Sequence, residues 1–288
     1  MKEIINKIRK IEVKIRTAVD THKHGNFKSV FRGSGIEFDD VRTYQYGDDI
    51  RAIDWNVTAK GHGTFVKTFQ EDREQNVYFI VDVSASLQIG NQGARKLDLA
   101  KELAAVLAYS ATKQNSNISL IAFSDQKEKY LKPESGLKHF YLFVNQLFNL
   151  EPKSTATNLN AAMSFAAGII KKKSVVILIS DFLALDYERP LAALAKKHDL
   201  IVMHVIDNFE IKLPRLGIIP VFDPEKRKVS WLNTSSLRLR KEITSNFEKR
   251  KEEIISICKK NKANYEIIET NKEYVSKLIK LFKTRRIK

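Results

Sequence analysis

Cysteine is almost absent from this sequence, which contains one, Cys258, in 288 residues. A single cysteine excludes a disulfide within the chain, and it excludes zinc or iron–sulfur sites built from several cysteines. Proteins of a reducing compartment commonly have this composition. We therefore expect a cytoplasmic protein that folds around a hydrophobic core, for which a hydrophobic content of 43% is sufficient.

Long apolar runs are also missing. The longest, VVILI at 175–179 and LIVMHVI at 200–206, fall far short of the roughly 20 residues of a membrane-spanning helix. The first residues, MKEIINKIRKIEVKIRT, mix charges with apolar residues and lack the apolar segment of a signal peptide. We expect no transmembrane segment. An amphipathic basic helix at 1–20 is suited to packing on the protein, or to peripheral contact with anionic lipid.

Acidic residues are outnumbered. The chain has 50 Lys and Arg against 34 Asp and Glu, and residues 209–288 alone hold 21 basic and 10 acidic side chains. Such a surface attracts nucleic acid, acidic lipid or acidic protein faces, and composition does not choose among them. Nucleic-acid binding is therefore one alternative function, without a recognisable reading motif, through Lys249, Arg250, Lys251, Lys259, Lys260, Arg285 and Arg286.

From residue 76 onward, short apolar strands alternate with amphipathic helices. This order predicts an α/β fold with a doubly wound, mainly parallel sheet covered by helices on both faces. We expect strands at 76–84, 118–124, 174–180, 199–207 and 265–269, and helices at 97–112, 137–148, 159–170, 187–197, 237–260 and 273–282. The proline-punctuated residues 208–234 predict an inserted β-hairpin at the margin of the sheet.

The chain is thus predicted to have two parts. Residues 1–75 form an N-terminal helix and an irregular cap segment, and residues 76–288 form the α/β domain with its hairpin insertion. The histidines show no metal-ligand spacing, and His204, inside an apolar strand, is expected to be a packed core residue.

Oxygen-bearing side chains follow the first predicted strand. Asp82, Ser84 and Ser86 alternate at the carboxyl edge of the sheet, where α/β proteins place their ligand sites. Thr157, in TATNLNAAM, opens a later helix, and Asp181 ends another core strand in the position equivalent to Asp82. Hard oxygen donors of low total charge suit Mg2+, Mn2+ or Ca2+ better than zinc or copper. The alternative is that the hydroxyls only cap helices and turns.

This combination resembles the von Willebrand factor A family, whose metal-ion-dependent adhesion site joins an Asp-x-Ser-x-Ser turn, a threonine and an aspartate after a later strand. The resemblance implies that Ser84, Ser86 and Thr157 bind the ion directly. It also implies that Asp82 and Asp181 act chiefly through waters, and that a Glu or Asp of a partner fills an open position. An ion with few charged protein ligands stays electrophilic and binds such a carboxylate strongly.

The segment GSGIEFDDVRTYQYGDDIRAIDWNVTAKGHGTFVKTFQEDRE, directly before the first strand, resembles the family 58 domains of unknown function. The matching residues are Gly33, Gly35, Glu37, Phe38, Arg42, Tyr44, Gly47, Asp48, Arg51, Ile53, Asp54, Trp55, Ala59 and Glu71. Leu87 and Lys60 depart from the family's usual residues. Members of that family are often associated with MoxR-type AAA ATPases, which implies a non-enzymatic, chaperone-like role in assembling or activating client proteins.

The same segment is rich in acids and arginines. Asp39, Asp48, Asp49 and Asp54 lie near Arg32, Arg42 and Arg51 in the sequence, and Trp55 offers an apolar anchor. A structural Arg–Asp network is a commoner use of such residues than a catalytic carboxylate cluster.

An enzyme is the other alternative, because an aspartate after the first strand also marks magnesium-dependent phosphatases and hydrolases. Such folds need a second carboxylate two residues later, where this chain has Ser84. Neither a Gly-x-Ser-x-Gly elbow nor a Walker A loop occurs. We therefore favour a non-enzymatic, metal-dependent protein-interaction module.

Overall fold

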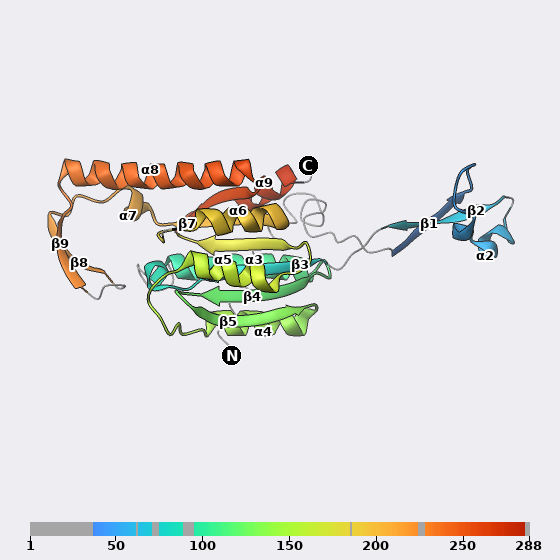
Figure 1. The fold of residues 1–288 in the computed structure, drawn as a ribbon, viewed down its shortest axis with the longest axis horizontal. Helices are drawn as coiled ribbons and strands as arrows, with labels where there is room; N and C mark the ends of the chain where they lie inside the picture. The colour runs from blue at the N-terminus through green and yellow to red at the C-terminus, as the bar shows by residue number, and fades with distance from the viewer. Residues whose placement is uncertain are drawn as a thin grey trace.

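The computed structural model describes residues 37–61, 63–70, 75–88, 95–184, 186–223 and 228–285. Its centre is a six-stranded sheet of order β10-β7-β6-β3-β4-β5 (Figure 1). The parallel strands are β3 (Asn76–Asp82), β4 (Asn117–Phe123), β6 (Val175–Ser180), β7 (Asp199–Ile206) and β10 (Asn264–Glu269). The predicted doubly wound, mainly parallel sheet is confirmed.

Helices cover both faces of the sheet, as the apolar strands require. One face packs against α3 (Lys96–Thr112), α4 (Leu137–Phe148) and α9 (Val275–Arg285). The other packs against α5 (Leu159–Ile169), α6 (Glu188–Lys197) and α8 (Leu237–Lys260). Every residue of β6 is buried, which explains why this strand reads as a continuous apolar run and not as an alternating one.

One strand of the sheet, β5 (Lys127–Glu134), was not predicted. It pairs antiparallel with β4 at the edge of the sheet, and most of its side chains are half-buried or exposed. Its sequence, KEKYLKPE, therefore carries charges and a proline where a central strand would carry aliphatic residues, a composition that suits an edge strand.

The predicted β-hairpin insertion is confirmed. Strands β8 (Ile218–Asp223) and β9 (Lys228–Asn233) pair antiparallel and form a two-stranded sheet of their own, separate from the central sheet. A short helix, α7 (Asn208–Ile211), precedes the hairpin and was not predicted. Asp207 and Glu210 form a capping box around its first turn, a signal that the sequence DNFE does carry.

The described part of the N-terminal segment is more regular than its composition suggested. Strands β1 (Glu37–Thr43) and β2 (Phe65–Gln70) pair antiparallel, with a 3-10 turn at Ile50–Ala52 and the short helix α2 (Trp55–Thr58) between them. In Figure 1 this unit lies beyond one end of the central sheet. The helix expected at 1–20 lies outside the described residues, and the division of the chain after residue 75 stays a prediction.

The expectation of no transmembrane segment can be compared with the described helices, and the position of Cys258 can be added. No helix among them combines the length and the apolar character needed to cross a bilayer. Cys258 lies on α8 against the sheet, where burial raises the pKa of its thiol to about 12. This thiol is a core side chain and not a reactive one.

His198, which ends α6, provides a test of the packing. Both of its ring nitrogens are buried without a hydrogen-bond partner in the described structure, and burial, followed by the charge of Lys197, lowers its pKa below 6.5. The unfolded chain therefore binds a proton more readily, so this residue reduces stability as the pH falls through about 6.5. We predict that His198→Leu loses less stability than wild type between pH 7 and pH 5 in urea unfolding. Equal losses would contradict this assignment.

Candidate metal centre

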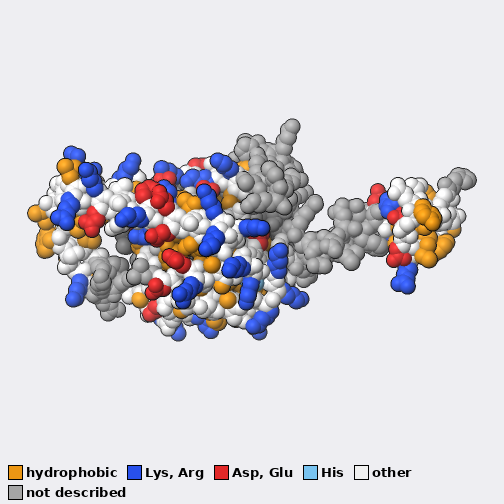
Figure 2. All heavy atoms as spheres, turned by 45° about the horizontal axis from the view of Figure 1, so that its top comes forward, with side chains coloured by type: hydrophobic (Ala, Val, Ile, Leu, Met, Phe, Trp, Pro, Cys, Tyr) orange, Lys and Arg blue, Asp and Glu red, His pale blue; other side chains and the backbone are white. Residues whose placement is uncertain are grey.

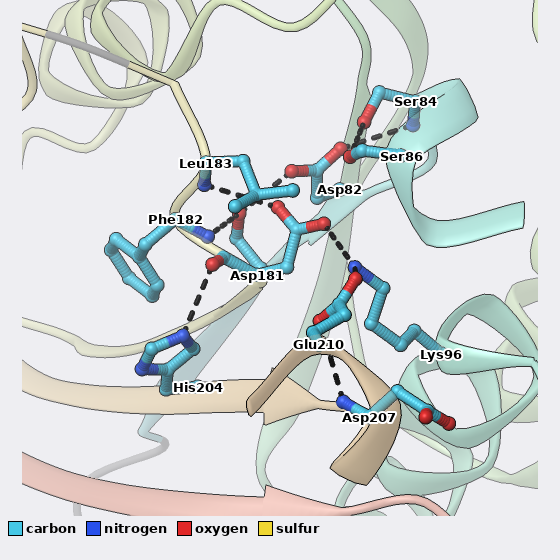
Figure 3. Close-up of polar contacts among 11 residues, drawn as sticks. Asp82, Ser84, Ser86, Lys96, Asp181, Phe182, Leu183, His204, Asp207 and Glu210 are labelled. Carbon is cyan, nitrogen blue, oxygen red and sulfur yellow. Dashed lines mark hydrogen bonds and ion pairs between the residues drawn. The ribbon is translucent and has the colours of Figure 1, made fainter. Parts of the chain in front are cut away.

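Asp82 is the last residue of β3, and its side chain is completely buried at the carboxyl edge of the sheet (Figure 3). One carboxylate oxygen, Oδ1, accepts a hydrogen bond from the backbone N–H of Ser84 at 3.0 Å. The other, Oδ2, accepts one from the Ser180 hydroxyl at 2.7 Å. Both oxygens are thus oriented by neighbouring groups, which fixes where this carboxylate points.

Ser84 and Ser86 follow in the turn that leads into a short 3-10 helix at Ala85–Gln88. Both are buried, and their hydroxyl oxygens lie 3.1 Å apart. Two neighbouring ligands of an octahedral Mg2+ ion, each about 2.0–2.1 Å from it, are separated by roughly 3 Å. The spacing of this hydroxyl pair therefore suits two adjacent ligand positions on one ion.

Asp181 reaches the same place from β6. This strand pairs in parallel with β3, Val81 opposite Ile179, so that the residues after the two strands emerge side by side. The Asp181 side chain is almost fully buried, and its Oδ1 accepts a hydrogen bond from the Leu183 N–H at 3.2 Å. Phe182, between them, has a positive φ of 53°, a strained conformation that turns the chain directly behind the carboxylate.

His204 of β7 supports Asp181 from behind. Its Nε2 donates to the Asp181 carbonyl oxygen at 3.0 Å, and its Nδ1 lies 2.7 Å from the Tyr265 hydroxyl. A carbonyl only accepts, so Nε2 carries the proton and Nδ1 accepts from the tyrosine. Burial lowers the pKa of His204 to about 4, which keeps the ring neutral. The prediction that His204 is a packed core residue is confirmed.

Thr157 lies in the third loop at this edge. Two backbone hydrogen bonds hold this loop in place. Before Thr157, the Thr155 carbonyl accepts from the Ala85 N–H at 3.1 Å. After it, the Asn158 N–H donates to the Ser124 carbonyl at 3.1 Å. Asn158 also caps the first turn of α5. The structure thus gathers Asp82, Ser84, Ser86 and Asp181 in one cluster and brings the loop of Thr157 beside it.

A buried lysine in this cluster was not predicted. Lys96, in the first turn of α3, is 1% exposed, and its Nζ lies 2.7 Å from Asp181 Oδ2. The same ammonium group also forms an ion pair with Glu210 of α7. Burial alone lowers the pKa of Lys96, but the two carboxylates outweigh burial and hold the pKa above its usual value. Lys96 is therefore charged, and it connects α3, β6 and α7 (Figure 3).

The charges of this cluster fit one divalent cation. Burial, and secondarily the charge of Asp181, raises the pKa of Asp82 to about 7, because two neighbouring carboxylates are costly to ionise there. With Asp82, Asp181 and Glu210 ionised and Lys96 protonated, the net charge is −2. The oxygens gathered here are the carboxylates of Asp82 and Asp181 and the hydroxyls of Ser84 and Ser86, a donor set that suits a hard divalent cation. The described residues contain no cluster of three His, Cys, Asp or Glu that suits a metal.

The acids of the N-terminal unit serve local structure. Asp48 accepts two hydrogen bonds from Arg42, at 2.6 and 2.8 Å, on an exposed surface, and the Gln45 N–H donates to the same carboxylate. Asp49 and Asp54 cap the short helices that follow them. This part of the predicted Arg–Asp network is one exposed pair and not a buried network. Arg32 and the side chain of Asp39 lie outside what the structure describes.

Trp55, predicted to be an apolar anchor, is 69% exposed. Its indole ring therefore presents an apolar surface to solvent, and the described residues do not bury it.

The Lys96 ion pairs lead to a stability prediction. Lys96→Met leaves the buried carboxylate of Asp181 and the half-buried one of Glu210 without a cation, so we expect a loss of about 3–5 kcal/mol in the free energy of unfolding. Urea unfolding in EDTA measures this loss. The same change at an exposed helix position, Lys138→Met, is the matched control and should alter stability by less than about 0.5 kcal/mol.

A second variant tests the cause of that loss. Adding Asp181→Asn and Glu210→Gln to Lys96→Met removes the uncompensated charges, and this triple variant should recover a large part of the lost stability. If the triple variant is less stable than Lys96→Met, the loss comes from packing of the lysine stem and the ion pairs are not its origin.

Several known proteins are similar to this chain in sequence or in fold. Uncharacterized proteins of Mycobacterium tuberculosis and Mycobacterium bovis are each 27% identical to this chain over 221 residues, covering 76% of it and 70% of the relative. Among solved structures, the protein BatB from Bacteroides thetaiotaomicron superposes with a TM-score of 0.49 at 16% identity, covering 74% of this chain and all of that one.

Two further structures show more distant similarity. The VWA domain of SpRpn10 has a TM-score of 0.40 at 12% identity and covers 72% of this chain and 94% of its own. Proximal thread matrix protein 1 from the mussel byssus, with a zinc-occupied MIDAS motif, has a TM-score of 0.40 at 15% identity and covers 73% and 47%.

A family comparison is more direct. Residues 40–253 match the family described as protein of unknown function DUF58. This match spans about three quarters of the 288 residues and includes both the N-terminal unit and the candidate metal centre. The chain therefore belongs to the DUF58 family, and its central sheet and helices form a doubly wound α/β domain.

Proposed function

We propose that this protein is a non-enzymatic interaction module that grips a partner protein through a divalent metal ion, Mg2+ or else Mn2+ or Ca2+, at Asp82, Ser84, Ser86, Thr157 and Asp181. The observation that carries this proposal is the pairing of two buried carboxylates with two buried hydroxyls 3.1 Å apart at one sheet edge. Hydroxyl ligands leave the ion most of its charge, so it can hold a further carboxylate from outside.

Lys96 has a defined part in this proposal. Its positive charge makes the cluster −2 where it would otherwise be −3, so a divalent ion brings the cluster to neutrality. A neutral, ion-loaded site does not repel an acidic side chain. A site with the same carboxylates and no lysine would keep a net charge of −1 after the ion had bound. Lys96 thus favours an acidic partner without being a ligand itself.

The partner we propose is a MoxR-type AAA ATPase, or a client protein that such an ATPase remodels. Membership of the DUF58 family is the basis of this choice, because the resemblance to that family implies an association with ATPases of this type. The partner would supply the Glu or Asp that completes the coordination of the ion. The protein would then act in the assembly or activation of clients, and the ATPase would supply the chemical energy.

An enzymatic role has less support. Aspartyl phosphoryl transfer needs a second carboxylate two residues after the nucleophile, and that position holds Ser84, whose hydroxyl is buried against Ser86. We expect no turnover of a panel of phosphate esters in Mg2+. Turnover that disappears in Asp82→Ala would instead establish the hydrolase alternative.

Metal binding is tested first, without any partner. We predict that Mg2+ at ten times its dissociation constant stabilises wild type by about 1.4 kcal/mol, and that Asp82→Ala abolishes this stabilisation. Thermal unfolding with Mg2+, Mn2+, Ca2+ or EDTA measures it. Asp125→Ala, which removes an exposed carboxylate after the neighbouring strand β4, is the matched control and should respond like wild type. An equal response of Asp82→Ala would sink the proposed site.

Partner binding is tested second. We predict that a candidate ATPase or client binds wild type and Asp125→Ala in Mg2+, and binds Asp82→Ala at least tenfold more weakly. Comparing variants at constant Mg2+ is essential, because EDTA would also remove the metal of the ATPase. Immobilised wild type and variants, probed with the partner over a concentration series, provide the measurement. Equal affinity for all three proteins would reject metal-mediated binding.

A further inference from the structure

The hairpin β8–β9 exposes one continuous apolar face. Its register places Pro220 opposite Trp231 and Phe222 opposite Val229, so these four side chains share a face with Ile218. All five residues are exposed, Trp231 at 71%, Ile218 at 66% and Phe222 at 57%. Figure 2 shows hydrophobic side chains gathered at the end of the molecule where β8 and β9 lie in Figure 1.

The core of the protein does not explain this face. The opposite face of the ribbon turns Ile219 and Leu232 inward, and both are half-buried. A two-stranded ribbon cannot bury both of its faces, and soluble proteins rarely leave a contiguous aromatic and aliphatic surface open. An external apolar phase or surface therefore has to cover Ile218, Phe222 and Trp231.

A basic cleft adjoins the ribbon. It has a volume of about 520 Å³ and is lined by Lys212 and Arg215, which precede β8, and by Leu237, Arg240 and Lys241 at the start of α8. Its one carboxylate, Glu248, is already paired with Lys251. Within the described part of the chain, none of the four cations pairs with a carboxylate. They are available for phosphate groups.

We infer that the ribbon and the basic cleft together form a surface that binds anionic phospholipid bilayers. Aromatic and aliphatic side chains of the ribbon would enter the interfacial layer, while the cations of the cleft contact the phosphates of the headgroups. The hairpin arm, residues 211–241, holds eight basic and two acidic side chains. Its net positive charge therefore attracts an anionic surface.

The charges also argue against two other occupants. A second copy of this chain would bring the same basic arm to the interface, and the two arms would repel each other. Nucleic acid would pair with the cations. The apolar side chains of Ile218, Pro220 and Val229, however, would make no favourable contact with a charged phosphate backbone. A bilayer accounts for the apolar face and for the adjoining cations at once.

Vesicle sedimentation of the full-length protein in EDTA tests this inference independently of the metal site. We expect binding to vesicles of 30% phosphatidylglycerol in phosphatidylcholine, and none to phosphatidylcholine alone. Arg240→Gln with Lys241→Gln should weaken binding about 30-fold, since each basic residue near an anionic surface contributes about 1 kcal/mol, or roughly fivefold in affinity. Phe222→Ser with Trp231→Ser should weaken it at least as much.

The matched control removes two cations from the other end of the same helix. Lys259→Gln with Lys260→Gln changes the net charge equally, and both residues are exposed. This variant should bind anionic vesicles within about threefold of wild type. Equal losses in both charge variants would show a general effect of net charge and overturn the inference. Duplex DNA binding that requires both Phe222 and Trp231 would also overturn it, in favour of a nucleic-acid surface.

Tryptophan fluorescence locates the contact. The chain has two tryptophans, Trp55 and Trp231, so Trp55→Phe leaves Trp231 as the sole reporter. We expect a blue shift of its emission on anionic vesicles and quenching by lipids brominated near the headgroup. Emission that stays unchanged while the protein sediments with the vesicles would show that another surface is bound.

Discussion

The proximity of two buried carboxylates, Asp82 and Asp181, is the constraint around which the carboxyl edge of the sheet is organised. Burial, and secondarily the charge of Asp181, raises the pKa of Asp82 to about 7. Each carboxylate receives a different compensation. Asp82 accepts hydrogen bonds from neutral donors, the Ser84 N–H and the Ser180 hydroxyl. Asp181 has a full positive charge beside it in Lys96. Asp82 thus has only neutral hydrogen-bond partners, and a further cation beside it would favour its ionised form.

This division of roles follows from the topology of the sheet. The parallel pairing of β3 with β6 brings the two strand ends together, and the residues after them have to turn away over the edge. The turn after Asp82 holds Ser84 and leads into the 3-10 helix that contains Ser86, and the turn after Asp181 uses the strained Phe182. Lys96 begins α3, which packs across the sheet, so its side chain reaches the same edge from a third direction.

Hydrophobic periodicity could predict most of the fold because the central strands are buried on both faces and the covering helices on one. Helices α4 and α8 begin and end where their patterns indicate. The edge strand β5 escaped prediction because its charged residues face solvent. For the candidate site, a motif was enough to find Asp82, Ser84, Ser86 and Asp181. It was not enough to find Lys96, which pairs with residues 85 and 114 positions away and reads as an ordinary surface lysine at the start of a helix.

Lys96 also relates the candidate metal centre to the hairpin arm. Its second partner, Glu210, belongs to α7, and the chain leaves α7 directly toward Lys212, Arg215 and the apolar ribbon. The arm therefore starts at the carboxyl edge of the sheet, on the side where the ion would be held (Figure 1). The ion pairs of Lys96 with Asp181 and Glu210 fix the position of α7 at this edge. They do not by themselves establish energetic coupling between the two sites. Its consequence is geometric. A protein held through the ion and a bilayer held through the arm would both approach this chain from the same end, so that the partner would be presented close to the lipid surface.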